Sequence, residues 1–391
     1  MACPDFQVSV EKCEDIRMLS LDGLSGEHDA VPYQSAGERP AEYDRKSAQA
    51  RTIMRDPIDG FLAQRPLVIL DGALATELER RGADLKDPLW SAKCLIERPD
   101  LIHAVHLDYF NAGADVATTA TYQATFEGFA RRGIAGARAA QLMRDAVALA
   151  AAARREFWAV EANRAGRLRP LVAASVGPYG AMLADGSEYR GHYALDDAAL
   201  AQFHRPRLQV LADAGADLLA CETIPSLREA QVLANLLEGF PDACAWISFS
   251  CKDGGHTSEG DPIGECAAEL HRYPQIVAVG VNCTPPQYIT PLLRRMHGET
   301  DKPLVAYPNS GEFYEASSRQ WRGATGTRGD SGTVDSGAGG SGAGGSGTLE
   351  FGEQARRWHA EGARLIGGCC RTGPDDIRSV KQCVHPEHSA Y

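Results

Sequence analysis

Short apolar runs alternate with longer segments of helical character from Leu67 almost to the end of the chain. The runs have the length of strands, and all but the last precede a segment long enough to cross back over a sheet. Strands alternating with helices predict a parallel sheet, and eight such units predict closure into a (β/α)8 TIM barrel. The predicted strands are Leu67–Leu70, Asp115–Thr118, Leu171–Ser175, Asp217–Ala220, Ala243–Phe249, Ile276–Val281, Leu304–Ala306 and Arg364–Ile366.

A local repeat supports this unit structure. The segments Phe110–Asp115, Ala212–Asp217 and His359–Arg364 each end a helical pattern and open a predicted strand, with a glycine at the fourth position. Glycine just past a helix end predicts a left-handed cap. The repeat concerns the fold and carries no chemistry.

The domain organisation follows from where the alternation begins and where it is interrupted. Residues 1–66 are mixed in charge and weakly periodic, which predicts a partly disordered N-terminal extension with a helix near Arg45–Arg55. Residues 67–391 form the barrel domain. Within it, residues 323–348 hold 11 glycines among 26 residues. Such a segment buries too little apolar surface to offset its ordering entropy, so a flexible Gly/Ser-rich insert is expected.

Composition narrows the class of protein. The chain has 391 residues, of which 44% are hydrophobic and 24% charged, as in ordinary globular proteins, and its net charge of −12 argues against a nucleic-acid partner. Eleven irregularly spaced cysteines indicate reduced thiols rather than a secreted disulfide framework, and no run is long and apolar enough for a membrane helix. A cytoplasmic location is expected, with oligomeric state open. No phosphate loop, dinucleotide fingerprint or nucleophile elbow is found.

Polar residues follow the predicted strands on what becomes one rim of the barrel, where barrel enzymes carry their chemistry. Asp71 follows the first strand, Tyr122 the second, Glu222 the fourth and Asn282 the sixth. Each has an ordinary alternative. Asp71 could cap the helix that begins near Ala73, Glu222 could be a cap or a surface charge, and Tyr122 could be a simple rim aromatic.

Three thiols reach the same rim. Cys283 follows the sixth strand, and Cys369 and Cys370 follow the eighth, between glycines that allow the strand to break. Three thiolates around zinc leave a fourth corner open, as in catalytic zinc sites. The sequence therefore predicts that these cysteines bind Zn²⁺. Packing as small hydrophobes and a vicinal disulfide between Cys369 and Cys370 are the alternatives.

The same residues carry a family resemblance. The run GGCCRTGPDDI, with VNCTPP upstream and LDGALATELERRG near the start, resembles the homocysteine S-methyltransferase family from about Leu67 to about Val384. The resemblance implies an enzyme that transfers a methyl group to the thiol of homocysteine, giving methionine. It also implies that Asp71 and Glu222 hold the substrate ammonium and that Tyr122 approaches the metal when substrate is absent. Asn282 is expected to orient Cys283 or to contact substrate.

The methyl donor is inferred from two further segments. SVGPYGAMLADGSEYRGHY and YPNSGE resemble the branch that uses a sulfonium donor, S-methylmethionine or S-adenosylmethionine, and the rings of Tyr122, Phe126 and Tyr179 are candidate faces for its positive charge. Two alternatives stay open. Betaine could be the donor, or the chain could be a non-enzymatic barrel with a structural or redox-sensing zinc.

Overall fold

The computed structural model describes residues 56–85, 89, 91–311, 313–315, 320–322 and 350–384. The predicted helix at Arg45–Arg55 and the Gly/Ser-rich insert lie outside this range. Eight parallel strands form one sheet in the order β1-β10-β7-β6-β5-β4-β3-β2. Their bounds are β1 Val68–Ile69, β2 Val116–Thr118, β3 Leu171–Val176, β4 Leu218–Ile224, β5 Ala245–Phe249, β6 Ile276–Asn282, β7 Leu304–Tyr307 and β10 Ala363–Ile366.

The sheet closes on itself between its first two strands. Leu70 and Val116 form a parallel bridge, and the Asp115 amide donates to the Ile69 carbonyl at 2.6 Å. The Asp115 carboxylate accepts the Ile69 amide at 3.0 Å, which extends the pairing of a strand only two residues long. The predicted (β/α)8 barrel is thereby confirmed.

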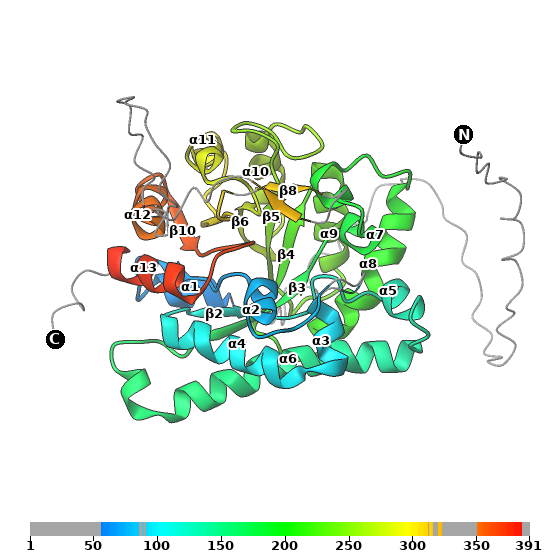
Figure 1. Ribbon diagram of the computed structural model, residues 1–391. Helices are drawn as coiled ribbons and strands as arrows, with labels where there is room; N and C mark the ends of the chain where they lie inside the picture. The colour runs from blue at the N-terminus through cyan, green and yellow to red at the C-terminus, as the bar shows by residue number, and fades with distance from the viewer. Residues whose placement is uncertain are drawn as a thin grey trace, which may run out of the picture. The chain divides into compact units, whose positions relative to one another are not determined.

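Helices surround the strands in Figure 1. They are α1 Pro57–Leu62, α2 Leu74–Arg80, α3 Ser91–Glu97, α4 Pro99–Ala112, α5 Phe126–Ala130, α6 Gly136–Ala159, α7 Tyr179–Leu183, α8 Asp197–Ala212, α9 Leu227–Leu237, α10 Ile263–His271, α11 Pro286–Met296, α12 Phe351–Ala360 and α13 Pro374–Val384, with short 3-10 turns η1 Glu161–Arg164 and η2 Ser187–Tyr189. None of the helices in the described residues is long and apolar enough to cross a membrane.

The helix-end glycines agree with the sequence prediction, whereas one pair of short strands was not predicted. The three repeat glycines, Gly113, Gly215 and Gly362, all have positive φ, as predicted for left-handed caps. An antiparallel pair, β8 (Phe313–Glu315) and β9 (Gln320–Arg322), follows β7 and was not predicted. Its strands are too short to show a periodic pattern.

Alternation along each strand separates the barrel interior from the layer under the helices. In β4, Leu218 and Ala220 join the interior cluster that contains Trp246 and Tyr307, whereas Leu219 and Cys221 join the cluster under the helices. Successive side chains of a strand face opposite ways, so Glu222 points into the barrel and Cys221 away from it. Cys221 is therefore a core residue beneath the helices rather than a residue of the rim.

Helix α1 packs against the barrel strands, although its residues fall within the predicted N-terminal extension. Asp56 caps the helix by accepting from the Ile58 and Asp59 amides. Ile58 and Phe61 are buried in the same cluster as Leu171 and Leu218, which open β3 and β4. The described part of the chain thus begins with a helix packed beneath the strand starts.

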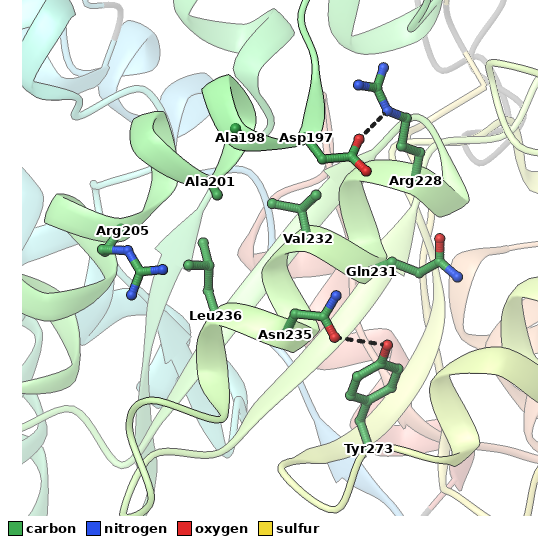
Figure 2. A pocket seen from close by; sticks show the side chains of 10 residues that line it. All are labelled: Asp197, Ala198, Ala201, Arg205, Arg228, Gln231, Val232, Asn235, Leu236 and Tyr273. Carbon is green, nitrogen blue, oxygen red and sulfur yellow. Dashed lines mark hydrogen bonds and ion pairs between the residues drawn. The ribbon is translucent and has the colours of Figure 1, made fainter. Parts of the chain in front are cut away.

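A groove of about 490 Å³ lies on the outside of the barrel between α8 and α9 (Figure 2). Arg228 at one end pairs with Asp197, and Tyr273 at the other donates to Asn235 at 3.1 Å. None of the residues predicted to carry chemistry lines this groove, so we assign it no catalytic role.

The close approach of β6 and β7 yields a first prediction. A Cβ added to Gly280 would overlap the Val305 carbonyl oxygen in the neighbouring strand, and that backbone cannot move without opening the barrel. Gly280→Ala should lower the free energy of unfolding by about 2 kcal/mol or more. Chemical denaturation followed by circular dichroism measures this change.

Gly60→Ala is the matched control, because nothing lies within 4 Å of a Cβ at this helical position. It should leave stability unchanged or raise it by up to ~1 kcal/mol. A Gly280→Ala variant with the wild-type denaturation midpoint would contradict the predicted steric conflict.

Candidate metal centre

Three sulfur atoms meet at the carboxyl ends of β6 and β10. The Sγ atoms of Cys283, Cys369 and Cys370 all lie within 4.8 Å of one another, and those of Cys283 and Cys370 are 3.5 Å apart. All three residues are free cysteines. Residues remote along the chain are brought together here because the two strand ends share one rim.

Local backbone geometry makes this convergence feasible. Cys283 has φ 47° and Arg371 has φ 68°. The backbone after β6 and the backbone after β10 therefore each turn through a residue in the left-handed conformation at the cluster. Such a conformation costs about 1 kcal/mol or more for a side chain other than glycine, and the surrounding contacts must hold it.

The glycines before the cysteine pair serve close approach. A Cβ on Gly367 would lie 2.6 Å from the Leu70 Cβ and 2.7 Å from the Asp71 carbonyl oxygen. The Gly368 amide donates to that carbonyl at 3.0 Å, and the Cys369 amide donates to the Pro308 carbonyl at 2.6 Å. Neither glycine has positive φ in the structure, so space rather than backbone freedom requires them.

The sulfur cluster suits a soft divalent metal. A tetrahedral ion with sulfur ligands at about 2.3 Å holds those sulfurs about 3.8 Å apart, close to the spacing seen here. Without a cation the three thiols do not ionise together. The Cys369 and Cys370 thiols and the Tyr189 hydroxyl hydrogen-bond to the Cys283 sulfur, which lowers the pKa of Cys283 well below its ordinary value and raises those of Cys369 and Cys370. The cluster is a candidate metal site.

Asn282 braces the cluster from the barrel interior. Its Oδ1 accepts the Thr223 amide at 2.7 Å and the Ser248 hydroxyl at 2.9 Å, and its Nδ2 donates to the Thr223 hydroxyl at 2.8 Å. The same Nδ2 lies 3.9 Å from the Cys369 sulfur. One buried amide therefore links the ends of β4, β5 and β6 to the cysteine pair.

Glu222 and Asp71 are buried at the same rim. Glu222 accepts hydrogen bonds from the Ser175 hydroxyl and, at 3.1 Å, from the Tyr307 hydroxyl, and burial raises its pKa to about 7. Asp71 accepts the Thr118 amide at 2.7 Å and the Thr118 hydroxyl at 3.0 Å, and burial raises its pKa to about 8.

The structural alternatives for these two carboxylates are wrong. The N-cap of α2 is Ala73, which makes no side-chain capping bond, so Asp71 does not cap that helix. Glu222 is only 9% exposed and lies inside β4, so it is neither a helix cap nor a surface charge. The predicted β4 ended too early, at Ala220. The strand continues to Ile224, with an irregular register beyond Cys221 and a left-handed Thr223.

The predicted aromatic residues take different places. The Tyr122 hydroxyl forms a hydrogen bond with the Thr223 side chain. Burial raises the pKa of Tyr122 well above its ordinary value, and the nearby Glu188 charge raises that pKa further. Tyr179 instead packs edge-on against Tyr193 and Phe203, with ring centroids 5.2 and 5.1 Å away.

Two residues at the cluster were not singled out in the sequence. The Tyr189 hydroxyl lies 3.1 Å from the Cys283 sulfur. Its neighbour Glu188 is largely buried, and that burial raises its pKa to about 7. Both lie in η2, a three-residue turn in the long connection between β3 and α8, which has no periodic pattern that could have predicted its place over the rim.

Comparison with known proteins identifies the family. A sequence profile described as "Homocysteine S-methyltransferase" matches residues 68–384, which is most of the chain. This chain belongs to the homocysteine S-methyltransferase family.

Similar members of the family align over nearly their whole length. Homocysteine S-methyltransferase YbgG of Bacillus subtilis (strain 168) is 52% identical over 325 residues, which cover 83% of this chain and 96% of that protein. The metallated form of the homocysteine methyltransferase MmuM from Escherichia coli superposes with a TM-score of 0.70 at 47% identity, covering 83% of this chain and 99% of that one. The oxidized form of the same enzyme superposes with a TM-score of 0.71 at 46% identity, covering 84% of this chain and 99% of that one.

The burial of Asp71 predicts a dependence of stability on pH. Between its ordinary pKa of 3.8 and the raised value of about 8, the native protein retains a proton that the unfolded chain has released. The unfolded state then binds fewer protons, so this residue makes the free energy of unfolding fall as pH rises through that window. Asp71→Asn should remove that part of the fall.

Denaturation of metal-free protein at pH 5 and pH 8 tests this. The free energy of unfolding of Asp71→Asn, relative to wild type, should rise by about 1 kcal/mol or more between the two pH values. Asp242→Asn, at an exposed position, is the control and should show no such change. Parallel pH profiles for Asp71→Asn and wild type would contradict the prediction.

Proposed function

We propose that this protein transfers a methyl group from a sulfonium donor, S-methylmethionine or S-adenosylmethionine, to the thiol of homocysteine, giving methionine. The observation that carries the proposal is the convergence of Cys283, Cys369 and Cys370 at the catalytic rim of the barrel. Membership of the homocysteine S-methyltransferase family supports the reaction class. Reduced cysteines are needed for such a site, which favours a cytoplasmic location.

The metal that these residues suit is zinc. Cys283, Cys369 and Cys370 would hold it as thiolates, leaving one position for a substrate atom. When bound, zinc would supply the acidity that removes the proton of the homocysteine thiol, whose ordinary pKa near ~8.5 leaves it mostly protonated at neutral pH. The buried amide of Asn282 would keep the Cys369 sulfur in place.

Asp71 and Glu222 would bind the ammonium group of homocysteine. Both carboxylates are buried and oriented by neutral donors, Thr118 for Asp71 and Ser175 with Tyr307 for Glu222. Neutral donors do not compensate the ionised form, so the substrate ammonium would favour ionisation of both groups and form strong charge-assisted hydrogen bonds with them. Tyr122, bonded to Thr223 beside Asn282, would border the same substrate space.

The methyl group would be transferred from the donor sulfur to the homocysteine sulfur in a single displacement. The homocysteine sulfur attacks the methyl carbon in line, a new S–C bond forms, and the donor S–C bond breaks with its electron pair kept by the donor sulfur. The thiol proton of homocysteine passes to solvent, and the sulfonium becomes a neutral thioether. With S-methylmethionine as donor, both products are methionine.

Metal content tests the ligand assignment. Wild-type protein should hold about one zinc per chain after dialysis against a weak chelator, as measured by plasma mass spectrometry. Cys283→Ser and Cys370→Ser should each lose most of it, because two remaining thiolates no longer complete the site. Cys383→Ser, at a half-buried thiol near the end of α13, is the matched control and should keep the metal. Zinc retained by both site variants would reject the assignment.

A donor panel tests the reaction itself. Purified protein with zinc and homocysteine is offered S-methylmethionine, S-adenosylmethionine and betaine in parallel, and methionine is measured by chromatography. Methionine should form at least ~100-fold faster with a sulfonium donor than without enzyme. Activity with betaine alone would replace the sulfonium donor with an ammonium one. No methionine from any donor would leave the site with a structural or redox role.

A further inference from the structure

Contacts to the backbone of Glu188 and to its neighbour Tyr189 hold this residue beside the sulfur cluster. The Ser250 hydroxyl, just past β5, donates to the Glu188 carbonyl at 2.9 Å. The Gly180 backbone in α7 packs so closely that an added Cβ would lie 2.5 Å from the Glu188 amide nitrogen. On its other side Tyr189 reaches the Cys283 sulfur at 3.1 Å. The position of Glu188 is therefore fixed from three directions.

The side chain of Glu188 differs from the other two rim carboxylates. Its Oε2 is buried and has no hydrogen-bond partner among the described residues, whereas both oxygens of Asp71 and of Glu222 accept hydrogen bonds. The nearest basic side chain in sequence, Arg190, is exposed and directed at the Asp185 carbonyl and the Ser187 hydroxyl. An unpartnered buried carboxylate oxygen is costly and calls for a ligand.

The surroundings of Glu188 define the charge of that ligand. Its carboxylate acts electrostatically on Tyr122, Cys283 and Cys370. Thiolates and a phenol offer no positive charge, and the attraction of the exposed Arg190 is smaller than the cost of desolvation, so a bound cation would have to satisfy the carboxylate. The thiols themselves account for a metal, and Asp71 with Glu222 accounts for the acceptor ammonium.

The remaining cation in the proposed reaction is the methyl donor. In-line attack brings the donor methyl group within reach of the acceptor sulfur, and therefore beside the cysteine cluster over which Glu188 lies. We propose that Glu188 is the counter-charge that binds the cationic methyl donor and selects it over neutral compounds of the same shape. This inference rests on the proposed methyl transfer and adds a residue to it.

The chemistry predicts which kinetic constant responds. The donor loses its positive charge as the methyl group leaves, so attraction to Glu188 is stronger before the transition state than in it. Interactions of this kind lower the KM without raising kcat. They also favour release of the neutral thioether product.

Glu188→Gln tests the inference, because it removes the charge and keeps the shape. With S-methylmethionine as the varied substrate, the KM should rise at least ~10-fold, in line with the loss of a hydrogen bond to a charged group, and kcat should change less than ~3-fold. The KM for homocysteine and the zinc content should stay at wild-type values. Glu188→Asp should recover part of the donor affinity, and Glu238→Gln, at the exposed C-cap of α9, should match wild type.

An inhibitor separates charge recognition from a structural role. In 2-amino-5-methylhexanoate a carbon replaces the sulfonium sulfur of S-methylmethionine. Its inhibition constant should be the same in wild type and in Glu188→Gln if charge alone is lost. Equal weakening of inhibitor and donor, or an unchanged KM for the donor, would overturn the role of Glu188 while leaving the proposed function standing. Absence of methyl transfer in wild type would refute both.

Discussion

The buried amide of Asn282 is the interaction on which the geometry of the rim depends. It bonds the backbone and hydroxyl of Thr223, the hydroxyl of Ser248 and, more weakly, the sulfur of Cys369. Both the oxygen and the nitrogen of the amide make hydrogen bonds. Neither a shorter nor a charged side chain could therefore replace Asn282 without leaving a buried polar group unpaired. Thr223 can keep its left-handed backbone, and Cys283 its own, because this network fixes the strand ends between them.

Acidic groups gather around this network. Three thiols and the carboxyl groups of Asp71, Glu188 and Glu222 lie at one rim, and desolvation holds the pKa values of all three carboxyl groups well above the ordinary range. Neutral hydroxyl and amide groups donate hydrogen bonds to both carboxyl oxygens of Glu222 and to both of Asp71. In the proposed function, a metal ion, an ammonium and a sulfonium would each match a different part of this rim.

The barrel could be predicted from the sequence because the alternation of an apolar run with a helical segment occurs eight times. Each run can be recognised from its own residues, without knowledge of the tertiary structure. It also placed the cysteines, Asp71, Glu222 and Asn282 at strand ends. The ends themselves were less certain, since Glu222 and Thr223 are polar like a loop yet pair inside β4, through partners that only the closed barrel brings near. Glu188 and Tyr189 were not singled out, because a three-residue turn in a long connection has no period to reveal its position.

The order of strands around the barrel has a consequence for how the chain matures. The last strand, β10, inserts between β1 and β7, so the first and last parts of the barrel are neighbours in space. During synthesis on the ribosome, a nascent polypeptide that lacks β10 carries Cys283 alone, beside an open seam. If the cysteine cluster holds a metal as proposed, all three ligands become available only after the segment with Cys369 and Cys370 has emerged, so a loaded site would mark a chain that was translated through its last strand.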